Sequence, residues 1–511
     1  MNGNPATVYL IGAGPGDPGL ITLRGKELLE TCDVIVYDYL ANDVFLRFAK
    51  PGAEIIYVGK MGGNHTLPQE GINALIVAKA KEGKSVARLK GGDPYMFGRG
   101  AEEAEELLEA GVAFEVVPGV TSAIAGAAYA GIPLTHRKFA SSVCFATGHE
   151  SPDKAESAHN WEALAKGVST LVFFMGMSNL SNIVRRLTDN GMDSKTPAAL
   201  IRWGTTSDHK SIAGTLAELP ALAEEHGFSA PSLIVIGQVV SLRDSLNWFE
   251  KRPLLGLGVV VTRAREQASA MTRQLESFGA KVVEFPAIRI EHPEDGAAAR
   301  EAACSLREFD WVVFTSPNGV EHFWRELDRL GLDARAFAAS SVAAIGTATA
   351  NALSAKGLRA DFVPEKFIAE DLLAGLAAQG VAKKRVLILR AKEARDVLPE
   401  GLQKAGAEVS VVSVYETVPV TGDVEEILRL IEDKSIRYIT FASSSSVTNF
   451  LMALPGETLR KYPDLRFACI GPVTAKTLED AGLPCHVMPE KYTMPSFVEA
   501  LVHDAAKRRN G

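Results

Sequence analysis

Short apolar runs alternate with longer amphipathic stretches through the first half of the chain. The runs VYLIG, DVIVYD, EIIYVG and FEVVPG occupy residues 8–12, 33–38, 54–59 and 114–119. Between them, EGINALIVAKAKEG (70–83) and GAEEAEELLEAG (100–111) carry apolar residues at helical spacing. Because strands and helices alternate in this order, the pattern predicts a parallel sheet of the α/β class.

A second set of apolar runs follows the small-residue stretch VPGVTSAIAGAAYAG (117–131), which we expect to form a tightly packed helix capped by Thr121 or Ser122. These runs are SSVCFATGH, STLVFFMG, AALIRWG and SLIVIGQVV. We therefore predict two lobes, 1–118 and 119–245, followed by a linker over 246–255. Since Trp248 and Phe249 lie in this linker, we expect it to be packed rather than loose.

The second half contains an internal repeat. FDWVVFTSPNGVEHF (309–323) returns as IRYITFASSSSVTNF (436–450), and AAIGTATANALSAKGL (343–358) returns as ACIGPVTAKTLEDAGL (468–483). PEKF (364–367) and PEKY (489–492) close the two units. A shift near 127 residues is too long for a solenoid, so the repeat indicates duplication of a whole α/β domain into two similar lobes.

The bulk composition narrows the class of protein. A chain of 511 residues is longer than a single hydrophobic core supports, and its length indicates three or four domains. The net charge of −8, without a basic block, argues against a nucleic-acid partner. No apolar run approaches a membrane span, and the N-terminus lacks a secretory pattern, so we expect a cytoplasmic protein. The five scattered cysteines form no C-x-x-C pair, and we expect neither disulfides nor a metal site.

The glycine-rich turn GAGPGDPG (12–19) differs from a dinucleotide fingerprint. Asp17 stands where that motif requires its third glycine, and an anion there disfavours a pyrophosphate. Pro15 and Pro18 remove backbone N–H donors and restrict the residues before them. The turn therefore favours a ligand without phosphates.

Polar residues follow several strands at the edge where open α/β sheets bind ligands. Asp38 ends VIVYD and Lys60 ends IIYVGK, so both should emerge at the carboxyl edge of the sheet. In RLKGGDPYMFGRG (88–100), adjacent glycines after a strand allow a ligand to approach the backbone, and Asp93 stands in a capping position. A plain strand-to-helix turn is the alternative.

The motifs GAGPGDPGLITLRG, VGKMGGNHTLPQEGIN, LKGGDPYMFGRG, VPGVTS, TGH, FFMGM and RWGT, in this order over residues 7–245, resemble the uroporphyrinogen-III C-methyltransferase family. The resemblance implies a two-lobed methylase that uses S-adenosylmethionine to methylate uroporphyrinogen III at C2 and C7, giving precorrin-2. It also implies a homodimer formed through this half. It places nine residues at the cofactor: Pro15, Gly91, Gly92, Asp93, Met96, Thr121, Ser122, Met175 and Gly204.

The same resemblance maps Asp38 and Lys60 onto the family's proton acceptor and donor. The alternative is that Asp38 caps a helix and Lys60 binds a substrate carboxylate. We expect Met177 and Met192 to be core residues. Because the implied substrate carries eight carboxylates, basic side chains near the site are candidate contacts, namely Arg88, Lys90, Arg99, Arg137 and Lys138.

The duplicated half resembles uroporphyrinogen-III synthase in FTSPNGVEHF, IGTATA, VSVYETV and IGPVTAKTL. The resemblance implies cyclisation of hydroxymethylbilane to uroporphyrinogen III with inversion of ring D and without a cofactor. It assigns residues 256–288 with 419–505 to one lobe and 289–418, including crossing strands near 289 and 416, to the other.

For this half, the resemblance makes Tyr415 the candidate proton donor, whereas a half-buried aromatic on a crossing strand is the alternative. Five hydroxyl residues lie at strand-to-helix turns, where they could cap helices, bind anionic groups or do both: Thr315, Ser316, Thr349, Ser443 and Thr474. Val473 stands where the family has a further threonine.

These features predict a bifunctional enzyme of tetrapyrrole biosynthesis, leading towards sirohaem or cobalamin, whose ligands are small tetrapyrroles. Two alternatives stay open. The first half could be a precorrin methylase that acts on another carbon, and the second half could be a non-catalytic module that binds a tetrapyrrole.

Overall fold

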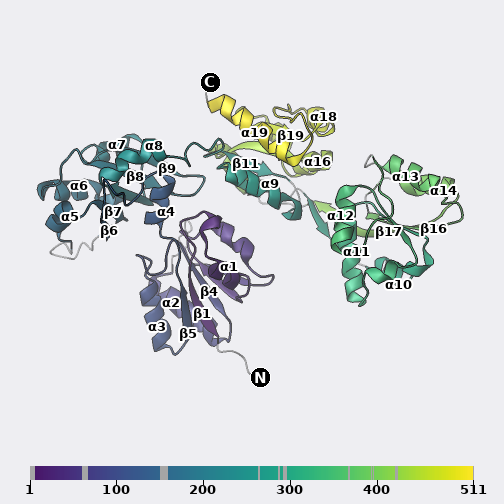
Figure 1. Cartoon of the computed structure of the whole chain (residues 1–511), viewed down its shortest axis with the longest axis horizontal. Coiled ribbons are helices and arrows are strands. Elements are labelled where there is room, and N and C mark those ends of the chain that lie inside the picture. The colour runs from purple at the N-terminus through teal and green to yellow at the C-terminus, as the bar shows by residue number, and fades with distance from the viewer. Residues whose placement is uncertain are drawn as a thin grey trace. The chain divides into compact units, whose positions relative to one another are not determined.

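The computed structural model describes residues 6–59, 67–149, 159–262, 265–285, 288–291, 296–365, 369–392, 394, 396–419 and 424–509. The chain divides into two compact units. The first comprises Met1–Gly258 with Arg273–Val282 and Val502–Gly511, and the second comprises Val259–Thr272 with Val283–Leu501. Figure 1 shows helices beside sheets along the chain, so the predicted α/β class is confirmed.

The first sheet is entirely parallel, as predicted. In order across the sheet, its strands are β3 (Glu54–Tyr57), β2 (Val34–Tyr37), β4 (Val86–Lys90), β1 (Thr7–Gly12) and β5 (Ala113–Val117). Its helices are α1 (Leu23–Leu29), α2 (Gln69–Lys81) and α3 (Gly100–Glu109). Because all five strands point the same way, the loops after β1, β2 and β4 meet at one edge.

The second sheet is mixed. Its strand order is β6 (Val143–Thr147), β7 (Thr170–Phe174), β10 (Ser232–Ile236), β8 (Pro197–Arg202) and β9 (Lys210–Thr215). Strand β10 is antiparallel to both of its neighbours, and β9 is antiparallel to β8. The apolar runs alone could not reveal the strand directions, because these depend on the connections between strands. A short connection such as 203–209 joins antiparallel strands, whereas parallel strands need a longer crossover.

Helices cover both faces of this second sheet. They are α4 (Ser122–Tyr129), α5 (Trp161–Gly167), α6 (Leu180–Asp189), α7 (Leu219–Glu225) and α8 (Arg243–Leu246). Alanines of α4 pack on one face, and α5, α6 and α7 pack on the other. Thr121 is the N-cap residue of α4, but its side chain makes no capping hydrogen bond.

The segment after α8 packs as predicted. Phe249 is buried, and its ring lies 4.7 Å from that of Tyr129 on α4. Trp248 is half exposed and also contacts Tyr129. Aromatic contacts of this kind hold the segment against the second lobe.

The second half of the chain contains two further sheets. One has the order β12 (Lys281–Glu284), β11 (Gly258–Val261), β18 (Ile436–Phe441) and β19 (Arg466–Cys469). The other has the order β13 (Ile288–Glu291), β17 (Glu408–Pro419), β16 (Arg385–Ala391), β14 (Trp311–Phe314) and β15 (Ser341–Ala344). The strands β13 and β17 pair antiparallel with each other.

The helices of this half follow the same alternation. The helices that alternate in sequence with the strands β11, β12, β18 and β19 are α9 (Arg265–Ser277), α15 (Val424–Glu432), α16 (Ser444–Ala453), α17 (Gly456–Leu459), α18 (Pro472–Asp480) and α19 (Met494–Arg509). The others are α10 (Ala297–Cys304), α11 (Pro317–Arg329), α12 (Thr347–Ala355), α13 (Ala369–Ala378) and α14 (Val397–Lys404).

The predicted duplication is confirmed. The order β14, α11, β15, α12 recurs as β18, α16, β19, α18, with the short helix α17 added between α16 and β19. Even an isolated bridge recurs, since Ala343 pairs with Phe362 in one copy and Ala468 with Val487 in the other. Within the described ranges, no helix combines the length and apolar character that crossing a membrane requires.

Candidate functional site

Bare backbone packs against backbone at the carboxyl edge of the first sheet. A Cβ added at Gly12 would lie 2.5 Å from the Cα of Gly119, and one at Gly119 would lie 2.2 Å from the carbonyl oxygen of Gly92. Gly14 and Gly92 exchange two backbone hydrogen bonds, of 3.1 and 2.7 Å. The glycines at the ends of β1, β4 and β5 therefore form one unit, in which Gly12 and Gly119 tolerate no side chain.

Gly92 lies beside the start of α4. Its φ of +70° is a left-handed conformation that favours glycine, and a Cβ there would face the backbone N of Ser122 at 3.8 Å and the Cα of Thr121 at 3.9 Å. The neighbouring Gly91 approaches the loop after β2, where its Cβ would lie 2.6 Å from the carbonyl oxygen of Leu40. Four of the predicted cofactor residues, Gly91, Gly92, Thr121 and Ser122, are thus near one another.

The Asp93 carboxylate is held by the main chain. One oxygen accepts the N–H groups of Tyr95 and Met96, at 2.9 and 3.0 Å, and the other accepts the N–H of Gly119 at 3.0 Å. Asp93 thus caps a turn rather than a helix, since the N-cap residue of α3 is Arg99. Because three donors occupy the carboxylate, Asp93 shapes the loop that carries Met96, whose side chain is 37% exposed.

The loop that begins at Pro15 contacts the second lobe through Asp17. The backbone N–H of Asp17 donates to Thr205 Oγ1 at 3.1 Å, and the Tyr129 hydroxyl donates to Asp17 Oδ2 at 2.6 Å. Burial and this carboxylate raise the pKa of Tyr129. Tyr129 was not predicted from the sequence, although a tyrosine within a helix of small residues is a signal that could have identified it.

Three residues of the second lobe have left-handed backbones: Met175, Trp203 and Thr205 have φ of 53°, 48° and 76°. Gly204 lies between the last two, and a Cβ there would lie 2.8 Å from the Cα of Gly126 on α4. Such conformations are costly for residues other than glycine and cluster at functional sites. The Met175 side chain is 52% exposed.

Two aromatic pairs join the lobes near these residues. Tyr39, which follows Asp38, lies edge-on to Trp203 with ring centroids 5.6 Å apart. Phe97 packs on Phe174, the residue before Met175, at 4.8 Å. The predicted cofactor residues therefore lie on loops that contact one another across the two lobes.

Asp38 forms an ion pair. Its Oδ2 accepts from the Arg88 guanidinium at 2.7 Å, and its Oδ1 accepts from the backbone N–H of Leu40 at 3.1 Å. Asp38 precedes no helix whose end it caps, since its bonds go to a turn and to Arg88. The Asp38 side chain is 27% exposed, so it can still contact a ligand. Lys60 lies outside the described residues.

The prediction that Arg88 and Lys90 contact a carboxylate substrate is wrong. Both side chains are buried and bond to Glu103, at 3.2 and 2.7 Å. Burial, followed by the neighbouring Arg88 charge, lowers the pKa of Lys90. A cation already desolvated and paired with a buried carboxylate has no face left for a ligand.

The other candidate cations are on the surface. Arg99 pairs with Glu102 at 2.6 Å, and both side chains are exposed. Arg137 and Lys138 are exposed in the loop after α4. Met177 and Met192 pack against the core of the second lobe, as expected.

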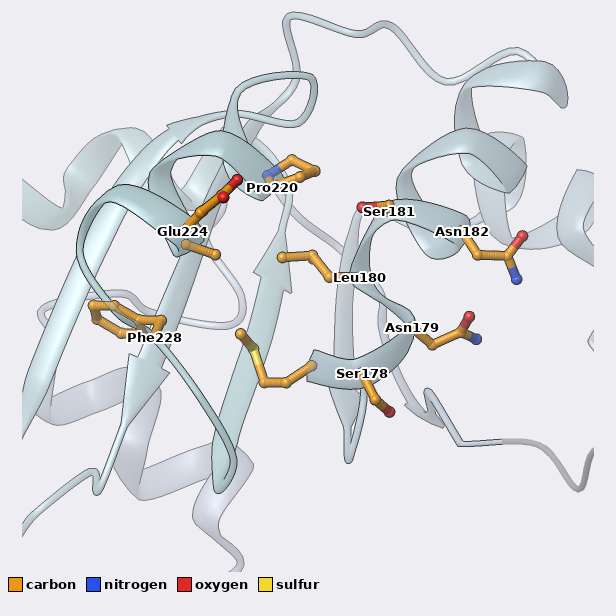
Figure 2. A pocket seen from close by; sticks show the side chains of 10 residues that line it. Ser178, Asn179, Leu180, Ser181, Asn182, Pro220, Glu224 and Phe228 are labelled. Atoms are coloured by element: carbon orange, nitrogen blue, oxygen red, sulfur yellow. The ribbon is translucent and has the colours of Figure 1, made fainter.

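A hollow of about 370 Å³ lies on the second lobe between η3 (Met177–Asn179) with α6 and the helix α7. Figure 2 shows Phe228, Glu224 and Pro220 on one side and Ser178 to Asn182 on the other. None of the predicted site residues lines this hollow.

In the duplicated half, two serines at equivalent positions cap helices. Ser316 Oγ accepts the N–H of Gly319 at 3.0 Å at the start of α11, and Ser443 Oγ accepts that of Ser446 at 3.1 Å at the start of α16. The capping interpretation is thus observed for both. The anion-binding interpretation stays a prediction.

The predicted threonines are more enclosed. Thr349 and Thr474 are buried in the first turns of α12 and α18. The Thr315 hydroxyl donates to the carbonyl oxygen of Leu389 at 3.2 Å. Val473, beside Thr474, is 75% exposed.

Tyr415 lies on β17, and its side chain is only 8% exposed. Its hydroxyl is 2.9 Å from Ser316 Oγ, and either oxygen can be the donor. The structure therefore brings together Tyr415 and Ser316, two residues 99 positions apart in sequence. Among the described residues, no cluster of histidine, cysteine, aspartate and glutamate could hold a metal ion.

Comparison with known proteins follows the same division of the chain. Residues 7–220 match the family of tetrapyrrole (corrin/porphyrin) methylases, and residues 269–499 match uroporphyrinogen-III synthase HemD. The porphyrin biosynthesis protein HemD of Ruminiclostridium josui is 38% identical over 97% of both chains. An S-adenosyl-L-methionine-dependent uroporphyrinogen III methyltransferase of Methanosarcina barkeri is 52% identical over 48% of this chain and 96% of its own. A solved structure of uroporphyrin-III C-methyltransferase from Thermus thermophilus is 40% identical over 48% of this chain and 98% of its own, with a TM-score of 0.41.

Proposed function

This chain belongs to the tetrapyrrole methylases in its first half and to the uroporphyrinogen-III synthases in its second, and from that premise we propose that it catalyses two consecutive steps. The second half converts hydroxymethylbilane to uroporphyrinogen III. The first half methylates that product at C2 and C7 to precorrin-2. The observation that carries this proposal is a relative 38% identical along nearly the whole chain, which includes both family regions.

The residues around Gly92 fit S-adenosylmethionine as the methyl donor. Side chains are absent at Gly91 and Gly92, and Gly92 faces the backbone N of Ser122, the first residue of α4. Such a surface can hold the carboxylate and hydroxyl groups of a ligand through main-chain bonds. When bound, S-adenosylmethionine supplies an electrophilic methyl group on a sulfonium sulfur. Pro15, Met96, Met175 and Gly204 complete the proposed contacts.

Asp38 acts at the pyrrole. As a ring carbon of the substrate gains the methyl group, the pyrrole nitrogen must release its proton, and the Asp38 carboxylate accepts it. The Arg88 guanidinium at 2.7 Å holds the carboxylate in place. We propose Lys60, which follows β3 in sequence, as the proton donor.

Tyr415 acts in the cyclisation. Its phenol donates a proton to the departing hydroxyl group of hydroxymethylbilane, the carbon–oxygen bond breaks, and water leaves. The resulting azafulvene cation is attacked by the substituted carbon of ring D, and the spiro intermediate reopens and closes with that ring inverted. The proton that the unsubstituted α-carbon of ring D loses on closure returns to the Tyr415 phenolate. Hydroxyl groups at Thr315, Ser316, Thr349, Ser443 and Thr474 bind substrate carboxylates. This half uses no cofactor and no metal.

The proposal extends to the organisation of the enzyme. The folding domains are 1–118 and 119–245 for the methylase, and 256–288 with 419–505 and 289–418 for the synthase. The protein forms a homodimer through its methylase half and works in the cytoplasm. Its product leads towards sirohaem or cobalamin.

The test is incubation of the full chain with hydroxymethylbilane, with and without S-adenosylmethionine, followed by mass and NMR analysis of the product. We expect uroporphyrinogen III without the donor and precorrin-2 with it. Methyl groups on other carbons would contradict the methylation proposed here. Tight binding of a tetrapyrrole without formation of isomer III would show that the second half is a binding module.

A further inference from the structure

Ser316 holds the hydroxyl end of Tyr415. The two oxygens are 2.9 Å apart, and Ser316 Oγ also accepts the N–H of Gly319 at 3.0 Å. The Ser316 hydroxyl is therefore held in place by the first turn of its own helix, α11, as well as by its bond to the phenol. The aromatic ring of Tyr415 lies in the hydrophobic core of this lobe, so its direction also depends on the side chains packed against it.

The helix α11 lies close to β17 along the side that carries this second contact. A Cβ added at Gly319 would lie 3.5 Å from the carbonyl oxygen of Leu389 on β16 and 3.8 Å from Val414 Cγ2 on β17. Gly319 thus lets the helix approach the strands closely. His322 is the residue three positions further along the helix, where side chains share a face with Gly319.

The His322 ring packs beside the Tyr415 ring. The two ring centroids are 5.7 Å apart with an angle of 33° between the ring planes. The His322 side chain is only 5% exposed, and that of Tyr415 is 8% exposed. Both rings are therefore enclosed and closely packed, so a substitution of one ring alters the position of the other.

A buried charge follows on the same face of α11. Glu326 is fully buried and pairs with Arg329 at 2.6 Å and with Arg300 of α10 at 3.4 Å. The other buried large residues of α11 include Val320, Phe323 and Leu327, which are apolar. His322 differs from these apolar residues in being the polar ring of α11 that lies beside Tyr415.

We propose that His322 is a positioning residue for Tyr415 in the cyclisation, which rests on the function proposed above for the second half. The imidazole supports the phenol ring from the helix side while Ser316 holds its hydroxyl. Together they fix the direction in which the phenol presents its proton to the departing hydroxyl group. His322 does not itself touch the substrate.

The internal repeat provides a matched control. The position equivalent to His322 in the second copy is Asn449 of α16, 127 residues later and half buried. Asn449 occupies the same place on an equivalent helix. Truncating each residue to alanine therefore separates a general effect on helix packing from an effect on Tyr415.

The experiment measures kcat and KM for formation of uroporphyrinogen III by the full chain. We expect His322→Ala to lower kcat about 10-fold with KM changed less than about twofold, because a misdirected phenol reacts slowly but leaves substrate binding intact. His322→Phe, which retains a ring, should recover most of kcat. Asn449→Ala should change kcat less than about twofold. Equal losses in the two alanine variants, or no loss in His322→Ala, would overturn the proposal.

A double-mutant cycle shows whether His322 acts through Tyr415. In the Tyr415→Phe background, His322→Ala should cause no further loss of kcat, and a further 10-fold loss would overturn the proposal. If His322→Ala fails to fold, His322→Leu fills the volume without a ring and replaces it in both comparisons. A wild-type chain that forms no uroporphyrinogen III contradicts the proposed function instead, so the two failures are distinguishable.

Discussion

At the scale of single residues, the two candidate acid–base residues that the structure describes each depend on a partner distant in sequence. Asp38 meets Arg88, and Tyr415 meets Ser316. The sequence predicted Asp38 and Tyr415 through their positions after or within strands and through family resemblance. It could not predict their partners, because residues 50 and 99 positions apart meet only when the sheet is assembled.

Replacing Asp38 with asparagine preserves the shape of the side chain but removes the proton acceptor. We expect Asp38→Asn to slow methylation about 100-fold, in the usual range for loss of a general base. The rate of precorrin-2 formation from uroporphyrinogen III measures this. Cyclisation by the same molecule serves as the internal control and should be unchanged. Full methylation by the variant would show that Asp38 is dispensable.

Ser316 and Ser443 allow a matched comparison, because both cap a helix but only Ser316 contacts Tyr415. Each substitution by alanine should destabilise its lobe by about 1 kcal/mol through loss of the cap. At saturating hydroxymethylbilane, where a lost carboxylate contact no longer limits the rate, we expect only Ser316→Ala to slow cyclisation by an additional factor of about 10, since it also frees the phenol. Unfolding midpoints and initial rates measure the two effects. Equal rates in both variants would contradict the role of Ser316.

At the scale of elements, a partly buried cluster fastens the segment after α8 to β9. The Glu250 carboxylate accepts hydrogen bonds from His209, Ser211, Asn247 and Arg243. Burial opposes its ionisation, but the bonds from His209, Ser211 and Asn247 outweigh burial and lower the pKa of Glu250 from 4.5 to about 2. The packed linker foreseen from Trp248 and Phe249 is thus also held by charge.

This cluster predicts a pH dependence of stability. Because the pKa of Glu250 is lower in the folded chain, its ionised form stabilises the fold above about pH 4.5, and this contribution is lost as the pH falls towards 2. Unfolding midpoints between pH 7 and pH 3 should fall more steeply for the wild type than for Glu250→Gln. Parallel curves would show that Glu250 contributes nothing to the acid sensitivity.

Sheet topology shows how far local pattern extends at this scale. The parallel first sheet followed from its strand and helix alternation, whereas the mixed second sheet did not. The direction of β9 and β10 depends on which loops cross over, and apolar runs carry no information on that. Likewise, Arg88 and Lys90 lie on β4, and both are buried and bonded to Glu103 of α3.

At the scale of the whole molecule, the fusion of two consecutive activities has a kinetic consequence. A tethered second site sees a higher effective concentration of the intermediate than a separate molecule does. We expect the wild-type chain to form precorrin-2 from hydroxymethylbilane faster than an equimolar mixture of Asp38→Asn and Tyr415→Phe chains with the same total of each active half. Rates measured at low protein concentration test this, and equal rates would show that the intermediate diffuses freely.

The sequence by itself determined the α/β class, the duplication in the second half, the glycine loops and the family of each half, because these depend on local period, repetition and motif. Only the tertiary structure decided which polar groups are available. In the folded chain, Arg88 and Lys90 are buried with Glu103, and Tyr129 is hydrogen-bonded to Asp17. Ser316 and His322 both contact Tyr415. The physical reason is that burial and pairing are properties of neighbours in space, and those neighbours come from distant parts of the chain.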